Sequence, residues 1–145
     1  APYWDMKAKG AIFGLTRDSG KSEIIKATLQ SLAFQTKDLI DAMQEEGGMT
    51  INKLRVDGGA SSNNWLMQFQ ADMLNSIVER PINVESTAMG VSLMGGIVLK
   101  WWTEESLLMQ ESKTQVFEPK MNQLTRERLF KNWQKAVQRT LNWDE

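Results

Sequence analysis

The residues whose types and spacing suit chemistry best lie in one short stretch, Val56-Asp57-Gly58-Gly59-Ala60-Ser61-Ser62-Asn63-Asn64. It stands between an expected strand and an expected helix. Paired glycines let a backbone come close to a ligand, and a helix N-terminus offers free N–H groups to an anion. This arrangement suits a nucleotide. The residues alone leave an equally ordinary alternative open, a tight strand-to-helix turn closed by an Asn or Ser cap.

A second stretch resembles a phosphate-binding P-loop but fails its spacing. The P-loop has four residues between its first glycine and the Gly-Lys-Ser that opens the helix. Here five residues separate Gly14 from Gly20-Lys21-Ser22. Because that loop must wrap phosphates with a fixed backbone geometry, one extra residue matters. An ordinary loop followed by a helix cap is the favoured interpretation.

Composition narrows the chemistry further. The 145 residues fit one domain and include no cysteine and no histidine, so thiolate or histidine metal sites and histidine-based triads are excluded within this chain. The net charge is −1 and no basic stripe stands out, which argues against a nucleic-acid partner. No apolar run is long enough for a transmembrane helix, so no membrane partner and a cytoplasmic location are expected. We assign no catalytic and no metal-ligating residue.

Strands that alternate with helices must position the turn, which predicts an α/β domain with a largely parallel sheet. The expected strands are Gly10–Thr16, Leu54–Asp57 and Ile77–Arg80, with Thr114–Phe117 extended. The expected helices are Ser22–Glu46, Asn63–Asn75, Thr87–Trp102, Glu104–Met109 and Leu124–Trp143. Three strands are few for such a sheet, so an upstream segment or a neighbouring chain is expected to supply others.

Helical spacing also predicts which side chains face the core. In the first helix these are Ile25, Leu29, Leu32, Thr36, Leu39, Ile40 and Met43; in the second, Leu66, Phe69 and Met73; in the last, Leu129, Trp133, Val137, Thr140 and Leu141. The third helix is rich in small residues, which predicts tight packing or a nearby ligand: Ala88, Gly90, Gly95 and Gly96.

Several stretches together resemble the FGGY carbohydrate kinases, and among them the glycerol kinases most closely. A signature of this family is matched in order by Gly10, Ile12, Gly14, Leu15, Glu23, Ile24, Ala27, Thr28, Leu29 and Gln30. Arg55–Leu74 resembles their adenosine-site stretch, and Val78–Pro81, Thr87–Gly90 and Trp133–Val137 are also similar. The resemblance covers essentially the whole chain.

The resemblance implies that residues 1–145 form the C-terminal nucleotide-binding domain of an FGGY kinase. The fold would be an α/β, ribonuclease-H-like half-domain of the actin, hexokinase and sugar-kinase type, which we expect to be incomplete. In the family, residues matching Gly59 and Asn63 contact the nucleotide, and Gly58 and Ala60 line the same turn. The ligand would be ATP or ADP, with Mg²⁺ in the full enzyme.

The implied reaction is the ATP-dependent phosphorylation of glycerol to glycerol 3-phosphate, in the cytoplasm, by an enzyme of glycerol metabolism. In the family, the catalytic base and the glycerol pocket lie upstream of the matched region. The isolated chain is therefore expected to be inactive, and glycerol to bind through the upstream half. Other interpretations stay open: a xylulose or gluconate kinase of the same family, or a non-catalytic interaction domain on this fold. A homo-oligomer is also compatible with the sequence.

Overall fold

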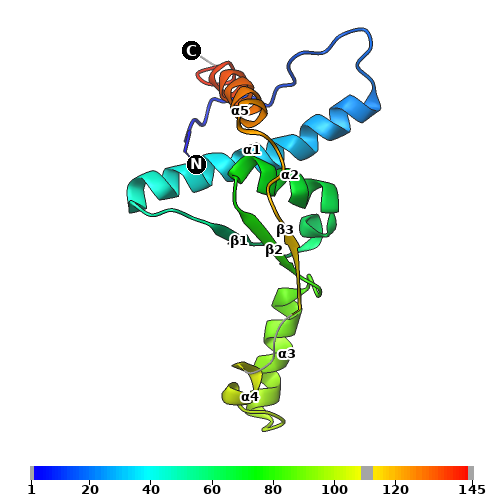
Figure 1. Ribbon diagram of the computed structural model, residues 1–145, viewed down its shortest axis with the longest axis vertical. Helices are drawn as coiled ribbons and strands as arrows, with labels where there is room; N and C mark the ends of the chain where they lie inside the picture. Colours follow the sequence, from blue (N-terminus) through cyan, green and yellow to red (C-terminus); the bar gives the residue numbers. More distant parts are fainter. Residues whose placement is uncertain (1, 109–112, 144–145) are drawn as a thin grey trace.

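A computed structural model describes residues 2–108 and 113–143 of the chain. A long helix, α1, crosses one face of a small sheet, with α2 between them and α5 beyond (Figure 1). The elements in chain order are α1 (Lys21–Gly47), β1 (Lys53–Arg55), the 3-10 turn η1 (Gly59–Ser62), α2 (Asn64–Leu74), β2 (Ile77–Pro81), α3 (Ser86–Val98), α4 (Glu104–Leu108), β3 (Thr114–Phe117) and α5 (Gln123–Gln138). The α/β prediction is confirmed; the expected end of the fourth helix, Met109, lies outside the described residues.

The sheet is mixed rather than largely parallel. Its strand order is β1-β2-β3, so β2 is central. β1 and β2 run parallel with Leu54 opposite Val78, as the α2 crossover between them requires. β3 runs antiparallel to β2 and places Phe117 opposite Val78. The predicted extended segment at residues 114–117 is thus an edge strand.

The expected strand Gly10–Thr16 is wrong. This segment is irregular, and within the described part of the chain it pairs with no strand. Ile12 and Phe13 expose 59% and 48% of their surface. An apolar run forms a strand only where a neighbouring strand pairs with its backbone N–H and C=O groups. Without such a strand, these groups must bond to water instead.

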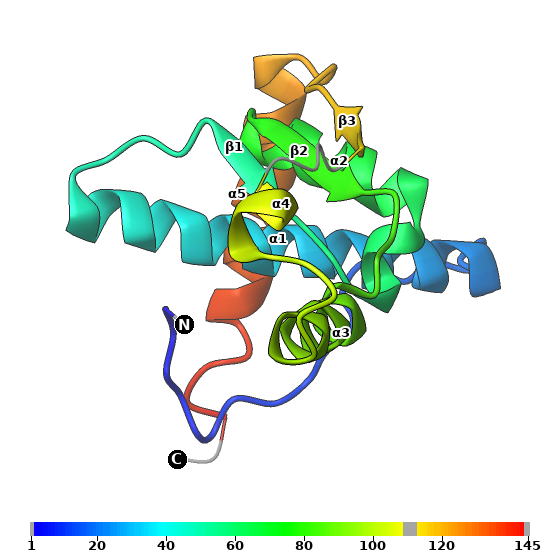
Figure 2. The same ribbon diagram turned by 90° about the horizontal axis from the view of Figure 1, so that it is seen from below.

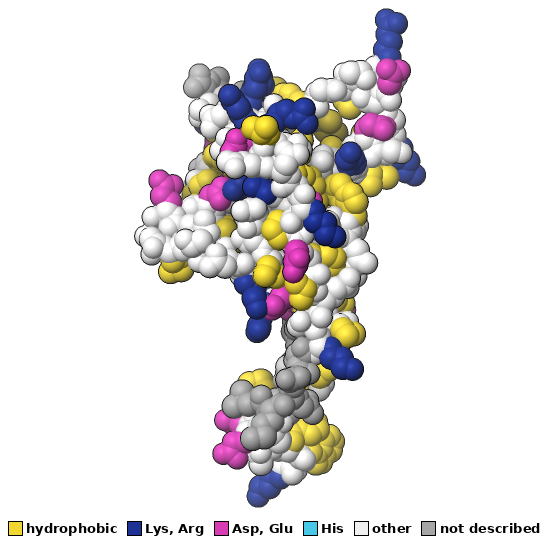
Figure 3. Space-filling view, in the orientation of Figure 1, with side chains coloured by type: hydrophobic (Ala, Val, Ile, Leu, Met, Phe, Trp, Pro, Cys, Tyr) yellow, Lys and Arg dark blue, Asp and Glu magenta, His cyan; other side chains and the backbone are white. Residues whose placement is uncertain are grey.

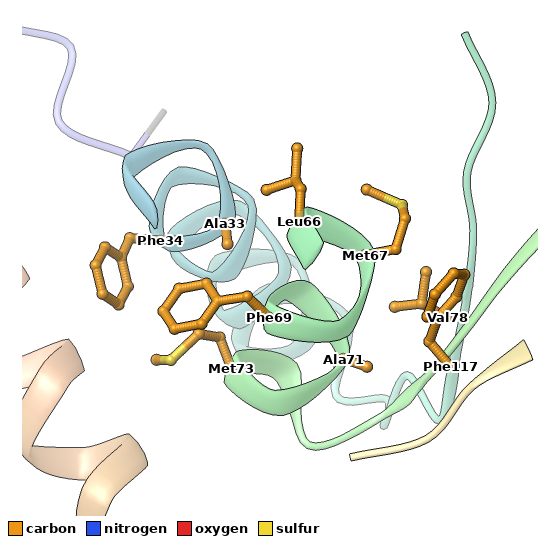
Figure 4. Close-up of a cluster of buried hydrophobic side chains, with 9 residues drawn as sticks. All are labelled: Ala33, Phe34, Leu66, Met67, Phe69, Ala71, Met73, Val78 and Phe117. Atoms are coloured by element: carbon orange, nitrogen blue, oxygen red, sulfur yellow. The ribbon is translucent and has the colours of Figure 1, made fainter. Parts of the chain in front are cut away.

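The core lies between α1, α2 and the sheet, as Figure 4 shows. The predicted inward face of α2 is confirmed, because Leu66, Phe69 and Met73 are all buried. Phe34 of α1 meets Phe69 edge-on, with ring centroids 5.6 Å apart. Val78 of β2 closes the core on the sheet side and is fully buried.

The predicted inward face of α1 is confirmed in part: Ile40 is buried and Leu29 packs against the core. The buried side chains are Ala33, Phe34, Asp38 and Ile40. By contrast, Ile25, Leu32, Leu39 and Met43 are 43–50% exposed. The helix has 27 residues and extends beyond the narrow sheet at both ends, as the view in Figure 2 makes clear. A three-stranded sheet with α2 against it covers only one face of so long a helix.

The ends of α1 follow local rules. Ser22, where the expected helix begins, lies inside α1, and Gly20 is the N-cap; the backbone N–H of Gly20 donates to Oε2 of Glu23 at 2.9 Å. At the other end, α1 ends at Gly47, one residue beyond the expected Glu46. Gly48 adopts the left-handed conformation with φ 58°, which favours glycine.

α3 and α4 extend away from the sheet as an arm, and hydrophobic side chains gather on its surface (Figures 1 and 3). The tight packing predicted for the small residues of α3 is confirmed at one of its three glycines, Gly96. The Trp102 ring lies so close to it that a Cβ on Gly96 would be 2.0 Å from Cζ2 of Trp102. At Gly90 and Gly95 a Cβ would meet nothing within 4 Å. Trp102 is held there by a hydrogen bond from its Nε1 to the Leu93 carbonyl at 2.9 Å.

The last helix ends at Gln138, earlier than the expected Trp143. The predicted core role of Trp133 is confirmed: its ring stacks on Phe34 at 5.5 Å, and its Nε1 donates to Oδ2 of Asp38 at 2.6 Å. Tyr3 donates to the other oxygen of Asp38 at 3.2 Å. Burial raises the pKa of Asp38, and these two hydrogen bonds oppose that rise.

Candidate nucleotide-binding turn

The candidate site is the connection between β1 and α2. Val56 continues the β1 pairing by donating its N–H to the Glu79 carbonyl at 2.9 Å. The chain then turns at Gly58, whose φ of 80° and ψ of 172° belong to a region that is essentially restricted to glycine. The N–H of Gly58 donates to the Val84 carbonyl at 3.0 Å, which ties the turn to the segment after β2.

Two serines stiffen the turn from within. The Ser61 side chain is buried and donates to the Gly58 carbonyl at 2.7 Å, and its N–H donates to the same oxygen at 3.0 Å. Ser62 donates its hydroxyl to the Gly59 carbonyl at 2.6 Å. These short-range bonds hold residues 59–62 as a single 3-10 turn.

Asn63 is the N-cap of α2. Its Oδ1 accepts a hydrogen bond from the Leu66 N–H at 3.1 Å, which satisfies one of the free donors at the helix start. The alternative interpretation of the sequence, a capped strand-to-helix turn, is therefore confirmed as geometry. The cap does not prevent Asn63 from binding a ligand, because the cap uses only Oδ1 of Asn63 and the side chain remains exposed.

The turn brings all four predicted site residues together. Gly58 is half-buried, whereas Gly59, Ala60 and Asn63 are exposed to solvent. The two glycines differ in what requires them. Gly58 is needed for its backbone conformation. Gly59 does not have a positive φ, and a Cβ built on it would meet no heavy atom within 4 Å. Without a ligand, the structure therefore does not require a glycine at this position.

A hollow of about 490 Å³ lies beside the turn. Its walls include Leu54 of β1, Val56 and Asp57 just after that strand, Ala60 and Ser61 from the turn, and Leu66 from α2. On the far side it is bounded by the exposed face of α1, including Leu32 and Leu39. Of the four predicted residues, only Ala60 lines this hollow. The walls are mainly apolar, which suits a flat ring better than a phosphate.

Arg80 contacts the turn, although the sequence interpretation gave it no role at the site. Its guanidinium donates to the Ser61 carbonyl, to Oδ1 of Asn64 and to Oε1 of Gln115. The sequence did contain a clue to its burial. Side chains alternate between the two faces of a strand, so Val78 and Arg80, two residues apart in β2, both point to the buried side. An arginine in that register must find oxygen acceptors inside the molecule.

The P-loop-like stretch forms no phosphate cradle of the P-loop type. No strand precedes it, and Thr16 and Ser19 close a local turn through a 2.9 Å bond from the Thr16 N–H to the Ser19 hydroxyl. Within residues 2–108 and 113–143, no cluster of three or more acidic side chains could hold a metal ion. In that same part of the chain, no helix is long and apolar enough to span a membrane.

Comparison with known proteins decides the family. The family sequence model for the C-terminal domain of the FGGY family of carbohydrate kinases matches residues 1–99, which include the whole turn. The chain belongs to the FGGY family of carbohydrate kinases. This FGGY chain is 52% identical over 144 residues to a glycerol kinase from Halorhodospira halophila, which covers 99% of the chain and 28% of that relative. A glycerol kinase from Carboxydothermus hydrogenoformans is 48% identical, with 99% and 29% covered.

Solved structures agree on the fold of this FGGY domain. The structure of Plasmodium falciparum glycerol kinase with ADP superposes with a TM-score of 0.80 at 34% identity, covering 97% of this chain and 28% of that one. A ligand-bound xylulose kinase from Lactobacillus acidophilus gives 0.70 at 22% identity, covering 96% and 29%, which supports the fold alone. The predicted sugar-kinase half-domain is confirmed. The chain spans between a quarter and a third of the length of these proteins.

Proposed function

We propose that this chain is the nucleotide-binding C-terminal domain of an ATP-dependent glycerol kinase, which phosphorylates glycerol to glycerol 3-phosphate. The observation that carries the proposal is the 52% identity to a glycerol kinase across 99% of the chain. The Plasmodium falciparum glycerol kinase was crystallised with ADP, which supports a nucleotide as the ligand of this domain.

Within the domain, we assign the nucleotide to the turn formed by Gly58, Gly59, Ala60 and Asn63. Three properties support the assignment. The turn is exposed at Gly59 and Asn63, it is held rigid by its serines, and it lies at the N-terminus of α2. Open space around Gly59 lets a ligand approach the backbone closely. The apolar hollow that begins at Ala60 offers room for a base.

The rest of the kinase supplies what the turn does not. Phosphoryl transfer needs held phosphates, a metal ion and a group that orients the attacking hydroxyl. We expect the catalytic base, the glycerol pocket and the Mg²⁺ ligands outside this chain, and the enzyme to act in the cytoplasm. The chain alone should then bind nucleotide without turning over glycerol.

The test compares the complete kinase with the isolated chain in a coupled ADP-release assay. The complete enzyme should show a higher kcat/KM for glycerol than for xylulose or gluconate. The isolated chain should show no glycerol turnover; a rate of about 1 s⁻¹, the low end of ordinary enzymes, would show that the catalytic machinery has been misplaced. A preference for xylulose would assign the chain to another FGGY kinase. Absence of nucleotide binding in both proteins would favour a non-catalytic domain.

A further inference from the structure

Arg80 is a charged side chain in an enclosed position. Only 9% of its surface is exposed. Its guanidinium meets oxygen atoms from three separate segments: the Ser61 carbonyl in η1, Oδ1 of Asn64 at 2.7 Å at the start of α2, and Oε1 of Gln115 in β3. The ring of Phe117 lies against it, with its centroid 5.3 Å from the Arg80 Cζ.

None of these partners carries a negative charge. Arg80 forms no ion pair with any carboxylate of the described residues, and the adjacent Glu79 pairs with Lys53 and Arg55 on the other side of the strand. A buried charge is costly unless its hydrogen-bonding groups are satisfied. Neutral oxygens satisfy the Arg80 guanidinium. The directions of its N–H groups therefore matter more at this position than the neutralisation of its charge.

We propose that Arg80 is a positioning residue for the nucleotide site. The Ser61 carbonyl lies between Gly59 and Asn63 in the chain, and the guanidinium ties it to the central strand and to β3. Arg80 thereby holds the exposed Gly59 and Asn63 in one arrangement before a nucleotide arrives. This inference rests on the proposed function, and it assigns Arg80 no contact with the nucleotide.

The chemistry of the side chain explains why arginine suits the position. A planar fork of N–H donors reaches several acceptors in fixed directions at once. A lysine ammonium is a compact charge and would satisfy one or two of these oxygens. A methionine keeps the apolar stem against Phe117 but leaves the Ser61 carbonyl and the Gln115 amide without their donor.

The experiment uses the complete kinase with Arg80→Met, Arg80→Lys and a matched control, Arg126→Met. Arg126 also donates to backbone carbonyls, those of Asp72 at 2.6 Å and Met121 at 2.9 Å, but away from the turn. Calorimetry gives the dissociation constant of ADP, and steady-state kinetics give KM for ATP and for glycerol. Arg80→Met should weaken ADP binding and raise KM for ATP by roughly 5- to 30-fold, with KM for glycerol unchanged. Arg80→Lys should fall between Arg80→Met and wild type.

Hydrogen exchange supplies a local readout. In the turn, the Ser61 and Asn63 amides are bonded to the Gly58 and Ala60 carbonyls. A peptide covering residues 57–64 should exchange faster in Arg80→Met without nucleotide, whereas Arg126→Met should leave it unchanged. If Arg80→Met does not fold, Arg80→Lys carries the same two measurements.

Two results would overturn the inference: unchanged exchange and ADP affinity in the Arg80 variants, or an equal loss of ADP affinity in Arg126→Met. The second would show a general effect of weakened packing. A wild-type kinase that binds no ADP at all would instead refute the proposed function, so the two failures are distinguishable.

Discussion

The two adjacent glycines of the turn allow binding and folding to be separated by substitution. Gly59→Val adds a branched side chain at a position with an ordinary backbone and no heavy atom within 4 Å of the new Cβ. We therefore expect the free energy of unfolding to change by no more than about 0.5 kcal/mol, as for other exposed positions. The same side chain should occupy the space that the nucleotide needs.

The expected cost to binding follows from overpacking. A side chain forced into a filled site costs roughly 1–3 kcal/mol, which is about five- to 150-fold in affinity, since every 1.4 kcal/mol is tenfold. Gly59→Val should raise KM for ATP and the dissociation constant of ADP by a factor in this range. KM for glycerol should stay close to that of wild type, because the turn does not contact glycerol under the proposed function.

Gly58→Ala is the matched control. Its φ of 80° with ψ of 172° disfavours any side chain, so alanine should destabilise the protein by about 1–3 kcal/mol through backbone strain. Thermal unfolding without nucleotide and ATP kinetics should be measured on both variants of the complete kinase. Gly59→Val should unfold like wild type yet bind ATP weakly. If it unfolds normally and also binds ATP normally, the nucleotide assignment of Gly59 is refuted.

Two further predictions concern stability. Gly96→Ala should lower the free energy of unfolding by about 1–3 kcal/mol, because its methyl group would overlap the Trp102 ring. Gly95→Ala, in open space on the same helix, should raise it by up to about 1 kcal/mol through helix propensity. Urea unfolding that ranks the two variants the other way would contradict the packing of Trp102 on Gly96. Because burial raises the pKa of Asp38 above its ordinary value of 3.8, the stability that this carboxyl contributes is full below that value and falls as the pH rises through the raised pKa. The stability of wild type relative to Asp38→Asn should therefore decrease from about pH 4 upward in urea titrations, and a constant difference would show that Asp38 titrates normally.

Local sequence signals determined much of the geometry of the candidate site. Glycine in the left-handed conformation ends α1 at Gly48, and the Gly58-Gly59 pair followed by Asn63 forms the turn and the helix cap that were expected. These features depend on residues a few positions apart, so the sequence contains their cause. The family signature likewise depends on residue types in order, and residues 1–99 match it.

Tertiary contacts decided the rest. Whether residues 10–16 form a strand depends on a neighbouring strand, and the described part of the chain provides none for them. Which face of α1 is buried depends on where α2 and α5 pack against it, so Phe34 and Ile40 are covered while Leu32 and Leu39 are not. Arg80 meets Ser61 and Gln115, which lie 19 and 35 positions away in the chain. No periodicity encodes such a meeting, because it arises only when β2 is placed between the turn and β3.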